Sequence, residues 1–125
     1  MEQTSAIQIH RHGGPEVLQA VGVDVPPPGP GELQIRQSAI GLNFADIYQR
    51  RGSHGPHTAA VFPITLGAQG AGVVQALGQG ASGWRVGQPV AYLHAGAYQV
   101  LRNVPAARVV ALPGHISEDM AGANL

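Results

Sequence analysis

The sequence has 125 residues, the length of one ordinary domain, and its formal net charge at pH 7 is zero. Only 11% of the residues are charged, so the sequence lacks the basic excess that nucleic-acid binding requires, and weak repulsion between copies favours self-association. Because there is no cysteine, disulfides, thiolate zinc sites and cysteine nucleophiles are all excluded.

The first third of the sequence predicts three strands separated by turns. Residues 6–10 and 33–39 alternate apolar and polar side chains, as strands with one buried face do, and residues 17–25 are rich in valine. The His-Gly-Gly-Pro sequence at 12–15 is a strong turn signal between the first two strands. The proline-rich run at 26–31 then predicts a stiff loop, because proline fits neither a helix interior nor a central strand.

One short helix is predicted between Asn43 and Gly52. Four residues in this interval recur at the spacing of one helical face: Phe44, Ile47, Tyr48 and Arg51. Asn43 is a favoured N-cap residue, and Asp46 adds negative charge to the first turn. Gly52 suits the C-terminal exit of the helix.

After a polar loop at 52–63, four further short strands are predicted. They cover residues 70–77, 90–93, 98–102 and 108–112. Ser117, followed by two acidic residues, is a favourable N-cap for a second short helix. Short strands separated by turns, with one or two short helices, indicate a mainly β barrel or sandwich.

Residues 78–83, Gly-Gln-Gly-Ala-Ser-Gly, match the pattern of a dinucleotide-binding turn, but their surroundings do not fit. That motif opens a helix and has an acidic residue about 20 positions further on. Here the segment from Trp84 to Pro89 cannot be helical, and the next acidic residue is Glu118. We therefore interpret this motif as a glycine-rich turn between two strands.

A second glycine-rich stretch, residues 67–72, leaves two interpretations open. Its glycines either let two backbones approach closely at a barrel corner, or form a surface for a ligand that the Gln69 amide contacts. Asn43 and Tyr48 also have two possible interpretations. They are either a helix cap and a core aromatic, or an amide and a phenol that hold a carbonyl oxygen or a cofactor ribose.

The six histidines do not predict a metal site. They include two close pairs, His10 with His12 and His54 with His57, but a zinc site needs three or four converging ligands. The sequence contains no H-E-x-x-H pattern, so we expect no bound metal.

Three segments resemble zeta-crystallin-like quinone oxidoreductases, in matching order and spacing. Residues 12–18 resemble the opening of that family, residues 39–52 contain its N-F-x-D-x-Y-x-R-x-G segment, and residues 66–78 resemble the glycine-rich stretch of medium-chain dehydrogenases and reductases. The resemblance implies a GroES-like, partly open barrel of short strands, the N-terminal, substrate-side domain of a two-domain reductase. Residues 1–115 would form this domain, and residues 116–125 would begin the connection to a nucleotide-binding domain that is absent from this chain.

The resemblance also implies the zinc-free branch of the family. In the zinc-dependent branch a cysteine stands at the position of Asn43 and a His-Glu pair at Ala68 and Gln69, so these ligands are missing here. Asn43 and Tyr48 would be the catalytic residues and would line the cleft that faces the nicotinamide. The same two residues, His54 and Gln69 would contact the cofactor. Gln69 replaces an acid that is usual in the family, so it keeps the hydrogen-bonding reach without the charge.

The implied function is hydride transfer from NADPH to a quinone or an activated enone, in which the protein orients and polarises the acceptor. One alternative is a truncated, non-enzymatic GroES-like module that self-associates or binds a partner. Another is a zinc-free reductase that acts on an enal or an enoyl thioester. Because the sequence shows neither a secretory signal nor a membrane span, we expect a cytoplasmic protein. By itself the chain is expected to bind NADPH weakly and to be inactive.

Overall fold

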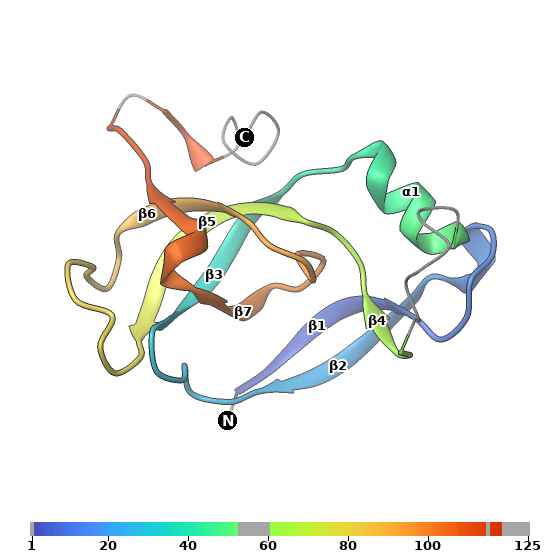
Figure 1. Ribbon diagram of the computed structural model, residues 1–125, viewed down its shortest axis with the longest axis horizontal. Helices are drawn as coiled ribbons and strands as arrows, with labels where there is room; N and C mark the ends of the chain where they lie inside the picture. Colours follow the sequence, from blue (N-terminus) through green and yellow to red (C-terminus); the bar gives the residue numbers. More distant parts are fainter. Residues whose placement is uncertain (1, 53–60, 115, 119–125) are drawn as a thin grey trace.

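Two antiparallel sheets and one α-helix make up the fold of the computed structural model, which describes residues 2–52, 61–114 and 116–118 (Figure 1). The smaller sheet has the order β2-β1-β4: β1 (Glu2–Ile9), β2 (Gln19–Val25) and β4 (Ile64–Thr65). The larger sheet has the order β7-β3-β5-β6-β8: β3 (Glu32–Ile40), β5 (Gln69–Leu77), β6 (Pro89–Leu93), β7 (Leu101–Pro105) and β8 (Val109–Ala111). The helical elements are α1 (Phe44–Arg51) and two short 3-10 helices, η1 (Pro15–Val17) and η2 (Ala106–Arg108).

Strand β3 organises the larger sheet, because it pairs with β5 on one side and with β7 on the other. Leu33 lies opposite Leu77 of β5 and opposite Val104 of β7. Two register shifts interrupt the pairing of β3 with β5, one after Gln34 and one after Gln37. Such irregularities bend a strand, and both β3 and β5 are visibly curved in Figure 1.

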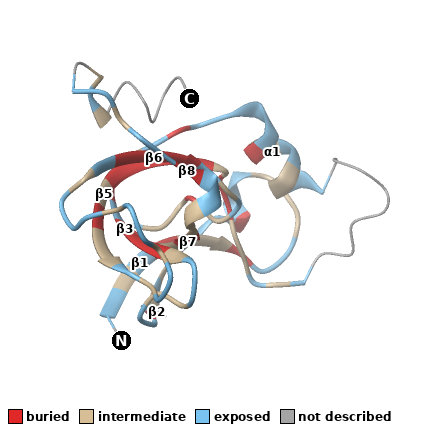
Figure 2. Cartoon of the chain, turned by 60° about the vertical axis from the view of Figure 1, so that its left-hand side comes forward, coloured by how far each residue is buried: buried red, intermediate tan, exposed pale blue. Residues whose placement is uncertain are grey.

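The main core lies on one face of the larger sheet. All five strands of that sheet contribute buried side chains to it: Leu33, Ile35, Val74, Val90, Tyr92, Val104 and Val109. Figure 2 shows the buried residues concentrated along these strands. Full burial of one Leu, Ile or Val side chain stabilises a fold by about 1.5–3 kcal/mol, so this cluster is the main source of stability.

Most predicted elements are confirmed, although some ends differ: the first strand, predicted at residues 6–10, begins at Glu2, and one later strand was predicted to begin too early. The sequence pattern starts that strand at residue 98, whereas β7 begins at Leu101. Residues before Leu101 connect the two sheets instead: the Ile7 N–H donates to the Tyr98 carbonyl at 2.8 Å, and the Val100 N–H donates to the Ser5 carbonyl at 3.1 Å. Strand β4 was not predicted, because two residues are too few to show alternation.

The motif at residues 78–83 is a turn, as predicted. It connects β5 with β6, and Gly80 and Gly83 have φ values of 81° and 90°, a backbone conformation that favours glycine. In the described chain, this motif leads to β6 at Pro89 without an intervening helix. It therefore cannot act as the phosphate-binding turn of a dinucleotide domain.

The stretch at residues 67–72 brings two backbones close together, which confirms the first of its two interpretations. A Cβ atom on Gly72 would overlap the backbone carbonyl of Arg36 in β3, and one on Gly70 would overlap the side chain of Gln37. Only glycine allows β5 to approach β3 this closely.

The second helix, expected to follow Ser117, falls largely outside the described residues. In the described part of the chain, no helix is long and apolar enough to cross a membrane.

Candidate functional site at the start of helix α1

Helix α1 is held at its start by a contact within its first turn and at its end by a neighbouring loop. Asn43 is the N-cap, and its N–H donates to Oδ2 of Asp46 at 3.1 Å. The helix ends at Gly52 in the left-handed region, with φ at 77°. Nε of Arg50 donates to the Gly13 carbonyl at 3.2 Å, which ties the end of the helix to the loop after β1. The predicted helix, its cap and its exit are therefore confirmed.

Asn43 and Gln69, two of the candidate site residues, are in direct contact. Nδ2 of Asn43 donates to Oε1 of Gln69 at 3.1 Å. Gln69 begins β5 opposite Leu93 and is only 4% exposed, whereas Asn43 is exposed. The Gly41 N–H donates to the Gln69 carbonyl at 3.0 Å, so β5 also holds the backbone that leads into α1.

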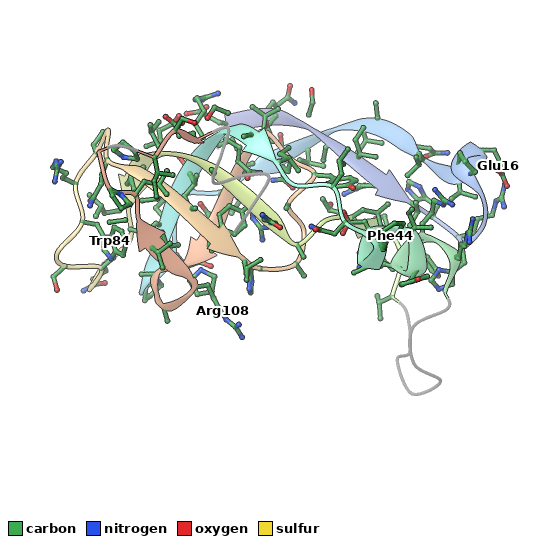
Figure 3. All side chains as sticks on the ribbon, turned by 90° about the horizontal axis from the view of Figure 1, so that it is seen from above. Glu16, Phe44, Trp84 and Arg108 are labelled. Atoms are coloured by element: carbon green, nitrogen blue, oxygen red, sulfur yellow. The ribbon has the colours of Figure 1, made fainter. Side chains whose placement is uncertain are left out.

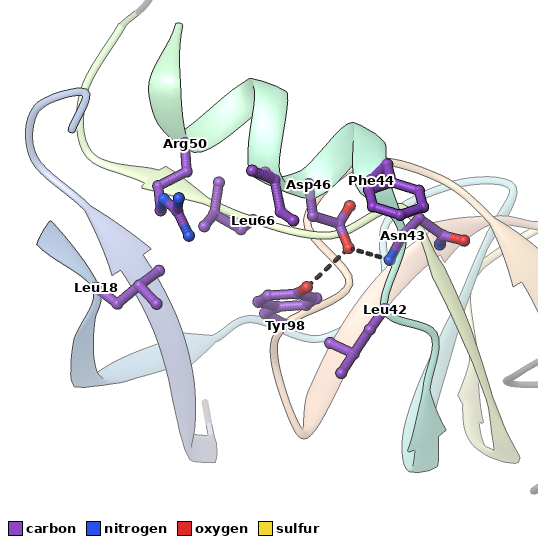
Figure 4. Close-up of a pocket in the computed structure, with 9 residues that line it drawn as sticks. Leu18, Leu42, Asn43, Phe44, Asp46, Arg50, Leu66 and Tyr98 are labelled. Carbon is purple, nitrogen blue, oxygen red and sulfur yellow. Dashed lines mark hydrogen bonds between the residues drawn. The ribbon is translucent and has the colours of Figure 1, made fainter. Parts of the chain in front are cut away.

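Asp46 and Tyr98 form a second polar contact that sequence reasoning missed. Oδ2 of Asp46 accepts the Tyr98 hydroxyl at 2.7 Å, in addition to the N–H of Asn43 (Figure 4). Burial, followed by the hydrogen bond to Asp46, raises the pKa of Tyr98 well above its ordinary value. The phenol therefore remains protonated at ordinary pH and donates to the carboxylate.

The other two candidate residues do not join this group. Tyr48 lies on α1 and is 49% exposed, so its interpretation as a core aromatic is wrong. It does not line the pocket beside the helix. His54 lies outside the described residues.

A largely apolar pocket of about 500 Å³ lies beside α1. Nine residues line it: Leu18, Leu42, Asn43, Phe44, Asp46, Ile47, Arg50, Leu66 and Tyr98 (Figure 4). A second, almost wholly apolar pocket of about 380 Å³ shares Leu42 and Tyr98 with the first. These two side chains therefore stand between the two pockets.

The polar groups at the start of α1 can form hydrogen bonds to a ligand. An asparagine amide carries two N–H donors, and the bond to Gln69 uses one of them. Across the described ranges, no three histidine, aspartate or glutamate side chains are placed to hold a metal ion. Apolar walls around a few polar groups are typical of pockets for small organic ligands.

Residues 29–115 match the alcohol dehydrogenase GroES-like domain, and this range is more than half of the chain. The chain belongs to this family. The family accounts for the mainly β architecture with two sheets that do not close into a barrel within the described residues. The GroES-like fold that the sequence resemblance implied is therefore confirmed.

Similar proteins include several named reductases. The quinone oxidoreductase of Salmonella typhimurium is 42% identical over 94% of this chain and 36% of that protein. The 2-haloacrylate reductase of a Burkholderia species is 36% identical over 91% of this chain and 35% of that protein. The crystal structure of Escherichia coli quinone oxidoreductase complexed with NADPH has a TM-score of 0.89 and 38% identity, over 97% of this chain and 37% of that one.

These similarities confirm the resemblance to quinone oxidoreductases. The chain spans little more than a third of the length of these relatives. The relatives therefore establish the family of this chain but not the reaction that the whole protein catalyses.

Proposed function

We propose that this chain is the substrate-side part of an NADPH-dependent quinone or activated-enone oxidoreductase that works without zinc. The observation that carries the proposal is the 3.1 Å hydrogen bond between Asn43 and Gln69 beside the larger pocket. It joins two residues that the family resemblance assigns to the cofactor contacts. Relatives named quinone oxidoreductase, and the NADPH complex of one of them, support the reaction class.

In this proposal the residues of the chain bind and polarise the acceptor. NADPH, when bound, supplies the hydride. Negative charge that develops on the acceptor oxygen is stabilised by a hydrogen bond from the Asn43 amide, which Gln69 holds in place, or from the Tyr48 hydroxyl on α1. Alternatively, the same groups hold the ribose of the cofactor. His54 and Gln69 are the further proposed cofactor contacts.

The proposed independence from zinc rests on the residues at the positions of the family's zinc ligands. Asn43, Ala68 and Gln69 stand at those positions, and none is a usual zinc ligand. We expect less than stoichiometric zinc after dialysis, measured by elemental analysis. Stoichiometric zinc bound through three protein ligands contradicts this part of the proposal.

A chimaera tests the proposed reaction most directly. In it, this chain replaces the matching segment of the Escherichia coli quinone oxidoreductase. We expect quinone-dependent oxidation of NADPH, and a lower rate when Asn43 and Gln69 are both changed to alanine. A chimaera that folds and binds NADPH but reduces neither quinones nor activated enones contradicts the proposal.

For the 125 residues by themselves we propose weak cofactor binding and no turnover. Residues 78–83 lie between strands, whereas pyrophosphate recognition uses N–H groups at the start of a helix. Calorimetry should therefore detect no NADPH binding at submillimolar concentrations. Tight binding, or oxidation of NADPH by this chain alone, contradicts the expectation.

The exposed apolar side chains around α1 favour a second candidate function, a non-enzymatic module that self-associates. Leu42 and Phe44 are 81% and 78% exposed, and the net charge of zero offers little repulsion between copies. Light scattering should give species larger than 12.9 kDa for the wild type and a monomer when both residues are changed to glutamate. A wild-type chain that stays monomeric when concentrated contradicts this candidate.

A further inference from the structure

We propose that Tyr98 is a positioning residue for Asn43 and acts through the carboxylate of Asp46. Its hydroxyl fixes the Asp46 side chain, which in turn fixes the backbone of Asn43 and thereby the amide that contacts Gln69. The effect on turnover rests on the proposed function, whereas the effect on the geometry of Asn43 does not.

The first step of the argument is the shared oxygen atom. Oδ2 of Asp46 accepts the Tyr98 hydroxyl at 2.7 Å and the Asn43 N–H at 3.1 Å (Figure 4). Asp46 is only 5% exposed, so water does not readily replace either donor. An acceptor held by two donors from different elements has little freedom to rotate, and it fixes the N–H of Asn43 relative to Tyr98.

The second step is the rigidity of the Tyr98 backbone. Its N–H donates to the Leu66 carbonyl at 2.8 Å, and its carbonyl accepts the Ile7 N–H at 2.8 Å. Nε2 of Gln37 donates to both the Ala97 and the Gln99 carbonyls, one on each side of Tyr98. Hydrogen bonds from three separate segments therefore hold this residue before its hydroxyl reaches Asp46.

The third step is the space kept for the Tyr98 ring. Gly67 has a φ of 93°, and a Cβ atom at that position would overlap Cδ1 of the ring. The ring thus lies directly over a glycine backbone, where no larger residue fits. Gly67 therefore leaves the space that the ring occupies, and the hydrogen bond to Asp46 orients the hydroxyl.

Hydrogen exchange of the isolated chain tests the geometric part of the proposal. In Tyr98→Phe we expect the Asn43 N–H to exchange about fivefold to tenfold faster, the effect of weakening one hydrogen bond, and the side-chain amide signals of Asn43 to shift. Tyr92→Phe is the matched control. It also removes a buried hydroxyl, which donates to Oε1 of Gln37 at 2.6 Å, but it keeps both donors to Asp46 and the Nε2 atom of Gln37 that donates on each side of Tyr98. The control should change the exchange rate less than twofold.

A double-mutant cycle tests whether Tyr98 acts through Asp46. In the Asp46→Ala background, the further change Tyr98→Phe should leave the exchange and the chemical shifts of Asn43 unchanged. An equal response of Asn43 to Tyr98→Phe with and without Asp46 overturns the proposal. Unchanged Asn43 signals in Tyr98→Phe alone overturn it too.

A reciprocal measurement keeps the test valid if Tyr98→Phe does not fold. The wild-type chain, labelled with 3-fluorotyrosine, retains all three tyrosine hydroxyls. Because coupling between two sites acts in both directions, Asn43→Ala should shift the fluorine resonance of Tyr98 more than that of Tyr92. A Tyr98 resonance that does not respond overturns the proposal.

The activity of the chimaera separates the two proposals. We expect Tyr98→Phe to lower kcat about tenfold while KM for NADPH changes less than twofold, with Tyr92→Phe as the control for lost stability. If the wild-type chimaera is inactive while the Asn43 signals respond as expected, the proposed function fails and the positioning role stands. If the chimaera is active and Tyr98→Phe leaves kcat unchanged, the positioning role fails.

Discussion

The larger sheet and the region around α1 use apolar side chains in opposite ways. Leu33 and Val104 are fully buried on the core face of the larger sheet, whereas Leu42 and Phe44 at the start of α1 are largely exposed. Figure 3 shows Phe44 on α1 and Trp84 at the far end of the molecule. Trp84 packs against the main core, whereas Phe44 lines an open pocket. Stability therefore resides mainly in the sheet, and binding surface in the helical region.

Polar contacts hold the start of α1, beside a smaller core cluster that contains Ile9, Val17 and Leu66. The one buried residue of this helix is Asp46, whose carboxylate connects the helix start with Tyr98. A helix held in this way leaves its apolar side chains available to a ligand or to another protein surface. The comparison teaches that hydrogen bonds order the start of the helix, whereas hydrophobic burial orders the larger sheet.

The largest expected effect is on the free energy of unfolding, and a pair of leucine substitutions compares the two regions. Leu33→Ala should lower the free energy of unfolding by about 2–5 kcal/mol, because it leaves a cavity in the main core. Leu42→Ala should change it by less than about 0.5 kcal/mol, because that side chain is already in water. Urea unfolding followed by circular dichroism measures both. Similar losses of unfolding free energy in the two variants would contradict the claim that stability resides mainly in the larger sheet.

The close approach of β5 to β3 predicts an intermediate effect. In Gly72→Ala the new Cβ would meet the backbone carbonyl of Arg36, so we expect a loss of about 1–3 kcal/mol. Gly22→Ala in β2 is the matched control, since an added Cβ there meets no atom within 4 Å. Its unfolding free energy should change by less than about 0.5 kcal/mol. Equal losses at both glycines would contradict the close approach of β5 to β3 at Gly72.

A smaller, pH-dependent effect is expected at His94, beside the larger sheet. Burial, followed by the charges of Arg102 and Arg108, lowers the pKa of His94 below its ordinary value of 6.5. The unfolded chain then binds the proton more readily, so stability is lost as the pH falls from 6.5 through the lowered pKa. His94→Asn should reduce the drop in melting temperature between pH 7 and pH 5. Identical drops in the two proteins would contradict the shift.

The sequence predicted those parts of the fold that depend on local patterns. Alternation marked β3, and Asn43 with Gly52 marked the two ends of α1. The connection before β7 was misread, because its course depends on the side chain of Gln37, a residue on another strand. Local periodicity contains no information about such a partner.

The candidate site was predicted in part. The contact of Asn43 with Gln69 joins two residues that the family resemblance had already singled out, although their spacing in the sequence did not predict it. Tyr98 was missed, because its partner Asp46 lies 52 residues away and no motif links them. The sequence signals for Asp46 were its place in the first turn of the helix and in the family's N-F-x-D-x-Y-x-R-x-G segment, and neither indicates a tyrosine from another loop.

The central claim is that Asn43 serves the reaction more than it serves the fold. In the chimaera, Asn43→Ala should lower the turnover of NADPH and quinone by at least about tenfold, as the loss of one hydrogen bond in the transition state would. The same change should lower the free energy of unfolding by only about 1 kcal/mol, the usual contribution of an N-cap. A variant that melts at a clearly lower temperature but keeps the turnover of the wild type would contradict this claim and would leave Asn43 as a helix cap alone.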